Sequence, residues 1–328
     1  MKIFHGALRC SFAPIALMLS SSAVCVAAAA QDYPTRPIRV IVSTAAGSTP
    51  DVTARLVTPA MSRLLGQQLV IDNRGGAGGL IAAELVANSV PDGYTLFVAS
   101  PGSLTILPHM RKVPYDTMRD FAPIGLISIG PFLLITHPAV PARSVKELIA
   151  LAKAKPGAMS YASAGNGVAN HLAMELFKQM AGVNIVHVPY KAAPQAVTDV
   201  LAGNIQMMFN SIAPVLPHVK SERVRALGIA SPKRSPQLPD IPAIAETVPG
   251  YESENWFGVF APAKTPQRII KLVNDALVKV VRSPEIKAQF EALGADPVGN
   301  SPEEFAAFVR RDTERWAKVV KVSGAKID

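Results

Sequence analysis

The sequence has almost no cysteine. Its two cysteines, Cys10 and Cys25, both lie within the first thirty residues. A mature chain that begins near Gln31 therefore has no thiol, which excludes disulfides, thiolate nucleophiles and cysteine-ligated metals. After residue 30 there is also no apolar run approaching the roughly 20 residues that a transmembrane helix needs. We therefore expect no membrane insertion.

Enzyme motifs that can be recognised by their spacing are missing as well. No Gly-Lys-Ser/Thr follows a glycine-rich loop, and Ile81 stands where the dinucleotide fingerprint needs its third glycine. HExxH and GxSxG do not occur. His171 and Glu175 lie one helical turn apart, but without a third ligand a polar helix face is the favoured interpretation. We therefore expect no metal, no cofactor and no enzymatic activity.

Positive charge exceeds negative charge, with a formal net charge of +9. The lysines and arginines are scattered rather than arranged in a stripe, and no basic patch is interleaved with aromatic residues. This pattern gives little support to nucleic-acid binding. A basic protein can favour anions, although charge alone more often reflects solubility.

The first thirty residues have the pattern of a secretory signal peptide. Lys2 and Arg9 form a positive region, an apolar run covers residues 12–26, and Ala27-Ala28-Ala29-Ala30 offers small side chains for cleavage. The run is too short to span a bilayer comfortably. We therefore expect export to the periplasm and a mature chain of about 298 residues, long enough to bury a core without disulfides.

Apolar strand-like runs alternate with longer stretches of helical periodicity, which is typical of α/β architecture. Pro59 interrupts the first helical stretch and predicts a kink or a short helix there. Proline and glycine cluster near residues 125–130 and 228–235, where a chain that leaves one lobe and returns to it would cross. We expect strands over residues 38–42, 68–72, 94–99, 131–136, 159–162, 185–188, 205–209, 224–230 and 256–261. We expect helices over residues 51–65, 80–88, 144–154, 168–180, 266–281 and 302–322.

Two strand–helix junctions are rich in glycine and small polar residues. The first runs from Ser43 to Asp51 and has Pro50 at a favoured first-turn position; the second runs from Ser160 to His171. Free N–H groups at a helix N-terminus bind an anion without a cationic side chain. Such junctions also occur throughout α/β proteins, because tight turns need glycine and helix caps need hydroxyls. Two of them facing each other across a cleft would hold a carboxylate well.

Short fragments along the mature chain occur in the order and spacing of one receptor family. They are Tyr33-Pro34-Thr35-Arg36-Pro37-Ile38-Arg39, Leu65-Gly66-Gln67, Asp72-Asn73-Arg74 with Gly76-Ala77-Gly78-Gly79, Pro91-Asp92-Gly93-Tyr94-Thr95-Leu96, Val113-Pro114-Tyr115-Asp116, Phe121-Ala122-Pro123-Ile124, His171-Leu172, Val188-Pro189-Tyr190-Lys191, Trp256-Phe257-Gly258 and Ala261-Pro262. Through them the chain, from Tyr33 to about Lys321, resembles the Bug-type extracytoplasmic receptors of tripartite tricarboxylate transporters.

The resemblance implies a two-lobed, periplasmic-binding-protein-like α/β fold. Mixed sheets flanked by helices form two lobes, which crossing strands join and which close over a ligand like a Venus flytrap. With the signal peptide at residues 1–30, lobe 1 would comprise residues 31–127 and 231–328, and lobe 2 residues 128–230. The family binds ligand through the first strand–helix loop and the serine/glycine loop of the second lobe. The ligand-binding residues expected here are Thr44, Ala46, Gly47, Ser48, Thr49, Ser100, Ser163, Gly165, Asn166, Gly167, His171 and Asn210.

Receptors of this family bind small carboxylates, such as dicarboxylates, tricarboxylates, acidic amino acids or aromatic acids, and hand them to a membrane permease. The resemblance thus implies a monomeric periplasmic receptor whose partners are a small carboxylate and permease subunits. Val168 replaces the family's usual Ser or Thr, and Ser48 its customary second glycine, which favours a partly apolar or aromatic acid over citrate. Two alternatives stay open: a sensor that signals to a membrane kinase, and a periplasmic hydrolase or isomerase.

Overall fold

The computed structural model describes residues 1–2, 33–235 and 238–323. Residues 3–30 of the predicted signal peptide, including both cysteines, lie outside the described residues. Residues Pro34–Asp328 form one compact unit. The description below concerns that unit.

The unit alternates strands and helices, which confirms the predicted α/β class. The strands are β1 (Ile38–Val42), β2 (Leu69–Asn73), β3 (Thr95–Ala99), β4 (Phe121–Thr136), β5 (Ser160–Ser163), β6 (Val186–Pro189), β7 (Met207–Ser211), β8 (Arg225–Ile229), β9 (Glu254–Pro262) and β10 (Asp296–Pro297). The helices are α1 (Thr49–Leu65), α2 (Leu80–Ala87), α3 (Leu107–Met110), α4 (Val145–Ala154), α5 (Ala169–Ala181), α6 (Ala193–Leu201), α7 (Ile212–Lys220), α8 (Gln267–Val281), α9 (Pro284–Ala292) and α10 (Pro302–Ser323). Three short turns of helix are η1 (Ala77–Gly79), η2 (Gly102–Ile106) and η3 (Ile244–Glu246).

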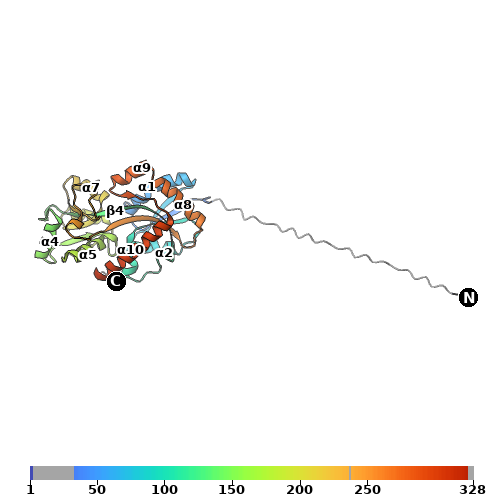
Figure 1. Ribbon diagram of the computed structural model, residues 1–328, viewed down its shortest axis with the longest axis horizontal. Coiled ribbons are helices and arrows are strands. Elements are labelled where there is room, and N and C mark those ends of the chain that lie inside the picture. Colours follow the sequence, from blue (N-terminus) through green and yellow to red (C-terminus); the bar gives the residue numbers. More distant parts are fainter. Residues whose placement is uncertain (3–32, 236–237, 324–328) are drawn as a thin grey trace. The chain divides into compact units, whose positions relative to one another are not determined.

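Two groups of strands share the long strand β4. In the first group, β2, β1 and β3 are parallel, and β3 continues through antiparallel β9 to the first part of β4, which also pairs with β10. In the second group, the last residues of β4 pair with β7 on one side and β8 on the other, and β7 continues through parallel β5 to β6. Figure 1 shows β4 running between α4, α5 and α7 on one side and α1, α2 and α8 on the other.

The length of β4 departs from the prediction, which began this strand at residue 131. Prolines and glycines near residues 125–130 suggested a break, but the strand runs through them with two register shifts against β9. Gly125 is needed for close packing, because an added Cβ would lie 2.9 Å from the Nδ2 atom of Asn274. Glycine in a strand often marks such a close approach. The first crossing between the lobes is therefore a continuous strand.

Each group of strands has its own buried core, and α10 contributes to both. Phe305 and Val309 pack in the core around β1, β3 and β9, whereas Trp316 and Val320 pack in the core around β5 and β7. Asp312 lies on α10 between these two pairs of residues. Its buried carboxylate accepts hydrogen bonds from Thr105 Oγ1 at 2.6 Å and from Nε1 of Trp256 in β9 at 2.7 Å. One helix thus fastens both lobes to a crossing strand.

The predicted lobe boundaries stay a prediction, and the contacts add detail to them. Ile244, Val248 and Tyr251 are buried in the second-lobe core, together with residues of α5 and β7. The chain re-enters the first group of strands at β9, where Glu254 pairs with Pro131. The segment from residue 243 to 251 therefore packs with the second lobe.

Four of the described helices, α3, α6, α7 and α9, were not predicted, and α1 is longer than expected. The helices α6, α7 and α9 each have nine residues and lie in stretches for which no helix was expected. The helix α1 extends over 17 residues with Pro59 inside it. Of the two predicted outcomes, the short helix is therefore wrong, and the kink stays a prediction. Proline removes only one intrahelical hydrogen bond, and the buried face of α1, which includes Val57 and Met61, spans the position.

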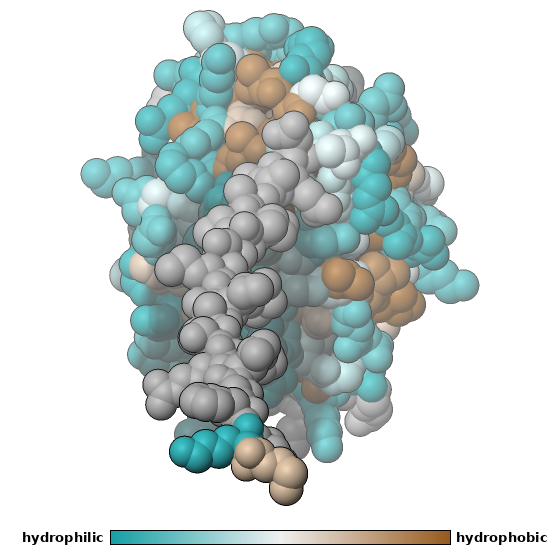
Figure 2. Space-filling model, turned by 90° about the vertical axis from the view of Figure 1, so that its right-hand side faces the viewer, coloured by the Kyte–Doolittle hydropathy of each residue, from teal (hydrophilic) through white to brown (hydrophobic). Residues whose placement is uncertain are grey.

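Figure 2 views the first-lobe end of the unit, where hydrophilic residues predominate and hydrophobic ones form small, separate groups. Large apolar side chains with more than a third of their surface exposed include Leu64, Val70, Ile81 and Val90. Singly exposed apolar residues are normal on protein surfaces. Within the described residues, no helix combines the length and apolar character needed to cross a membrane.

Candidate functional site

A cleft of about 820 Å³ lies between the two groups of strands. Helix N-termini and strand-ending loops from both lobes form its walls. Its lining comprises Ser43–Ala46, Ser48–Pro50, Asn73, Gly75–Gly79, Ser100, Gly102, Leu107, Arg111, Phe132, Ala164–Asn166, Val168–Asn170, Tyr190–Pro194, Asn210, Ser211 and Asn255. Ligand sites in open α/β sheets typically lie at this end of the strands, so the cleft is the candidate site.

The wall from the first lobe is the junction between β1 and α1. Asp51 anchors it: this buried carboxylate accepts hydrogen bonds from the Gly47 N–H at 2.8 Å and from Asn73 Nδ2 at 3.0 Å, and it pairs with Arg55. Burial alone would raise the pKa of Asp51, but the hydrogen bonds from Arg55, Gly47 and Asn73 outweigh it and lower the pKa. Gly47 has a φ of +77°, which few other residues tolerate. The loop is therefore held in shape by its own side chains.

The hydroxyls of this loop bind one another rather than the helix. Ser48 Oγ lies 2.6 Å from the carbonyl of Ala45, to which it donates, and 2.5 Å from Thr44 Oγ1. Although Ser48 is the N-cap residue of α1, its side chain accepts no hydrogen bond from the first turn. The first N–H groups of α1 are therefore left without a side-chain cap.

The wall from the second lobe is the junction between β5 and α5. Asn170 ties it together, because its Oδ1 accepts from the Ala164 N–H at 3.3 Å and its Nδ2 donates to the carbonyl of Phe209 at 3.2 Å. Gly165 and Gly167 take φ values of +132° and +77°. These glycines allow the backbone to turn toward the cleft directly before the helix.

Behind this wall lies a stack of buried rings. The ring centroids of His171 and His187 are 4.1 Å apart, and the His187 centroid is 4.8 Å from that of Tyr161. Burial is the main cause that lowers the pKa of His171 to about 4 and that of His187 to about 3, with added repulsion from Lys178 and between the two imidazoles. Both imidazoles are therefore neutral near pH 7.

Ser163 lies 2.6 Å from His187 Nε2, a distance that invites comparison with a nucleophile and its base. The surroundings favour a structural role. Ser163 is fully buried, and its hydroxyl donates to the Gly165 carbonyl and accepts from the Gly165 N–H. With its donor and one lone pair used within the loop, the hydroxyl is best satisfied by accepting from the Nε2–H of His187.

Within the described residues, five helices begin at the cleft without a side-chain cap, one of them being α2 with its N-cap residue Gly79. The N-cap residues of α1, α5, α6 and α7 also line the cleft, and none of their side chains accepts a hydrogen bond from the first turn. They are Ser48, Val168, Ala192 and Ser211. By contrast, Ser144 and Ser283 cap α4 and α9 outside the cleft. Helix N-termini carry partial positive charge and free donors, so their grouping here favours an anion.

Buried polar atoms in the cleft wall add to this pattern. Ser43 Oγ, Asn210 Nδ2 and Asn255 Oδ1 have no hydrogen-bond partner within the described part of the chain. Ser43 is 2% exposed and Asn210 is 4% exposed, so neither is freely hydrated. An unpaired buried donor or acceptor is costly, and such groups often mark sites that a ligand completes.

The charges along the cleft have one sign. Among the described lining residues, Arg111 and Lys191 are charged, and no aspartate or glutamate is present. Arg111 is half-buried and comes from the first lobe, whereas Lys191 is exposed and comes from the second. The cleft therefore presents an electropositive wall to a ligand.

Eight of the twelve residues predicted to bind ligand line the cleft. They are Thr44, Ala46, Ser48, Thr49, Ser100, Gly165, Asn166 and Asn210. Gly47 lines a neighbouring pocket instead. The buried Ser163 and His171 lie behind the wall, and the Gly167 N–H donates to His171 Nδ1 at 3.2 Å. The assignment of binding roles stays a prediction.

Other residues that line the cleft were not predicted to bind ligand. Arg111 follows a four-residue helix, and Tyr190 to Pro194 lead into α6, for which no helix was expected. Pro194 in the first turn of α6 was the available signal, because proline is favoured at that position. For Arg111 no local motif marks a role.

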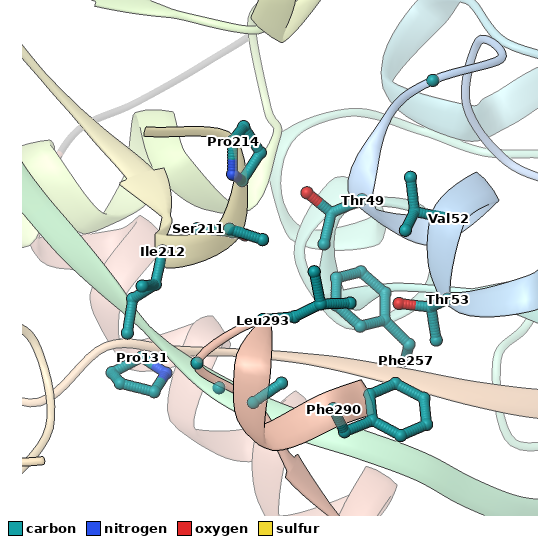
Figure 3. Close-up of a pocket in the computed structure, with 15 residues that line it drawn as sticks. Thr49, Val52, Thr53, Pro131, Ser211, Ile212, Pro214, Phe257, Phe290 and Leu293 are labelled. Atoms are coloured by element: carbon teal, nitrogen blue, oxygen red, sulfur yellow. The ribbon is translucent and has the colours of Figure 1, made fainter. Parts of the chain in front are cut away.

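A small apolar pocket of about 50 Å³ adjoins the cleft and shares Thr49 and Ser211 with it. Figure 3 shows its side chains coming from three helix ends: Val52 from α1, Ile212 from α7 and Leu293 from the end of α9. A cavity of about 150 Å³ can hold benzene, so this pocket has room only for a small group. It is contributed by both lobes.

The lobes touch where the side chains are smallest. A Cβ added at Gly78 would lie 3.5 Å from the carbonyl oxygen of Asn166, and one added at Gly102 would lie 3.5 Å from the Cα of Val168. These distances are ordinary van der Waals contact, so backbone packs against backbone across the cleft. Larger side chains would separate the two walls.

Comparisons with known proteins agree on one family. The sequence model of the tripartite tricarboxylate transporter family receptor matches residues 53–325. The protein BugT of Bordetella pertussis is 36% identical over 318 residues, which cover 96% of this chain and 98% of that protein.

Two solved structures from Rhodopseudomonas palustris share the fold. Rpa4515 with adipate is 35% identical and has a TM-score of 0.86, covering 90% of this chain and 100% of that one. MatC with bound malate is 30% identical and has a TM-score of 0.83, covering 88% of this chain and 100% of that one.

Proposed function

The chain belongs to the tripartite tricarboxylate transporter family of receptors, and from this premise we propose that it is a periplasmic receptor for a small carboxylate. It captures the ligand in the cleft between its lobes and delivers it to permease subunits in the membrane. It acts by binding and closure and performs no chemistry on the ligand. The signal peptide predicted from residues 1–30 is part of the proposal.

The observation that carries this proposal is the set of uncapped helix N-termini around a cleft wall free of carboxylates. The first N–H groups of a helix have no intrahelical partner, and they stabilise an anion through hydrogen bonds and the helix dipole. Asn210 supplies a further donor without a partner. A carboxylate satisfies these donors, and because they come from both lobes its binding favours the closed form.

Two related structures support the ligand class. Rpa4515 is described with adipate and MatC with malate, and both align over most of this chain. Adipate and malate are both small carboxylates. For this chain, we propose the same general class.

The test is binding to a purified mature chain, measured by calorimetry and thermal shift over a panel of mono-, di- and tricarboxylates. The informative variant is Asn166→Asp, because Asn166 is exposed and lines the cleft, so a negative charge enters the site without burial. Repulsion at about 4 Å amounts to about 1–4 kcal/mol, which raises Kd by about fivefold to several hundredfold.

Asn184→Asp makes the same change on an exposed residue of the same lobe that does not line the cleft. It should bind like the wild type. If the wild type binds no carboxylate in the panel, or if both variants bind as the wild type does, the proposed function is wrong. Conversion of a bound carboxylate, followed by mass spectrometry, would show that the protein is an enzyme.

A further inference from the structure

Arg111 is a cation without a partner in the wall of the cleft. It lines the cleft and is half-buried, and in the described part of the chain no carboxylate forms an ion pair with it. Other arginines of the first lobe, such as Arg39 and Arg55, pair with aspartates. A guanidinium that faces a binding cleft and lacks an internal counter-ion is available to an anionic ligand.

The segment that carries Arg111 is firmly placed. The Arg111 N–H donates to the carbonyl of Leu107 at 3.2 Å and so ends α3. After it, Tyr115 donates its hydroxyl to the carbonyl of Ser103, and Thr117 Oγ1 donates to the carbonyl of Leu104 at 2.5 Å. These bonds fasten residues 111–117 to η2, which gives the arginine a rigid base.

This base lies where the two lobes meet. Gly102, the first residue of η2, packs against Val168, the N-cap residue of α5, and Leu107 packs against Gly78, which in turn lies against Asn166. Arg111 therefore lines the cleft on a first-lobe segment that lies next to the α5 N-terminus. A ligand held by that N-terminus lies between it and the arginine.

We propose that Arg111 binds a second negatively charged group of the ligand, so that the receptor selects dianions over monoanions. This inference rests on the proposed carboxylate-binding function. One carboxylate is satisfied by the uncapped N–H groups and Asn210, which need no cationic side chain. The cleft of about 820 Å³ exceeds what a single carboxylate occupies and leaves room for a second group. The planar guanidinium matches a second carboxylate with two parallel hydrogen bonds.

The exposed Lys191 contributes less to this selection. It lines the opposite wall, but its side chain is exposed, so water and salt screen its charge. Arg111 is half-buried and is screened less. The arginine should therefore dominate the discrimination.

The experiment compares chain-matched ligands on Arg111→Gln and the wild type. The probes are adipate and hexanoate, which differ in one terminal carboxylate, and the same pairs at chain lengths of four to eight carbons. Calorimetry should show that the wild type prefers the dianion. The Arg111→Gln variant should lose about ten- to hundredfold in affinity for the dianion and change about twofold or less for the monoanion.

Lys112→Gln is the matched control, because Lys112 is an exposed cation one residue away that does not line the cleft. It should leave both affinities unchanged, which separates local binding from the effect of net charge. An equal loss for both ligands in Arg111→Gln overturns the proposal, because the arginine then binds the shared carboxylate. If the wild type binds monoanions as tightly as dianions, the proposal is overturned too, while the proposed function is left intact. Failure of the wild type to bind any carboxylate overturns both.

Discussion

Replacing Asn210 by leucine should change ligand affinity and protein stability in opposite directions. Asn210 is 4% exposed, and its Nδ2 has no acceptor among the residues that the structure describes. A hydrogen bond to a charged group contributes about 1.5–3 kcal/mol, so losing it should weaken carboxylate binding by about 10- to 150-fold. A buried donor without a partner costs about 1–3 kcal/mol, and leucine of similar size removes this cost. The ligand-free variant should therefore be as stable as the wild type or a few degrees higher in Tm.

Calorimetry with the tightest-binding carboxylate and urea unfolding of the ligand-free protein measure the two effects. Asn274→Leu is the control, because Asn274 is equally buried but donates to the carbonyls of Ile124 and Asn300 at 2.7 and 2.9 Å. This control should lose stability and keep its affinity. Asn210→Asp should bind more weakly than Asn210→Leu, because it adds a negative charge. If Asn210→Leu binds as the wild type does, or if it is destabilised like the control, the reasoning is refuted.

Two further predictions concern the ring stack and the contact between the lobes. The pKa values of about 4 for His171 and about 3 for His187 lie below the value of about 6.5 in an unfolded chain, so the unfolded state binds more protons below pH 6.5. The free energy of unfolding should fall by about 2–4 kcal/mol between pH 6.5 and 4.5, and by less in His187→Gln; a flat profile in urea titrations would contradict burial of neutral imidazoles. Gly102→Val should hold the lobes apart at Val168, lower carboxylate affinity at least about tenfold, and raise the radius of gyration of the ligand-saturated protein in X-ray scattering. Unchanged values of both would show that this contact is not needed for closure.

The alternation of strands and helices could be predicted because most strands are short apolar runs bounded by turn residues. The exception is β4, whose prolines and glycines suggest from the sequence alone that the strand is interrupted. Their role depends on partners distant in the chain, such as Asn274 beside Gly125. Local sequence patterns indicate which backbone conformation a residue favours. Tertiary packing decides which residue a position in the fold can accept.

The cleft loops could be predicted because a strand ending in small polar residues before a helix forms an anion-binding turn wherever it occurs. The direction of individual side chains was harder to predict. Ser163 was expected to bind ligand, and the structure buries its side chain completely, together with those of its strand neighbours Tyr161 and Ala162. Because both faces of β5 are buried here, strand alternation could not have indicated which side chain faces the cleft. For Arg111, only the three-dimensional arrangement brings the residue to the cleft.

The way α10 joins both cores has a consequence for the order of folding. The second-lobe core is built mainly from residues between Ile106 and Tyr251, yet it is completed by Trp316 and Val320 from α10. Until those residues have left the ribosome, that core lacks a fully buried tryptophan. A nascent chain that already contains all the strands of the second lobe therefore still waits for α10 before this core is complete. Truncation by a single turn or two at the C-terminal end of α10 should accordingly affect the lobe that lies far from it in sequence.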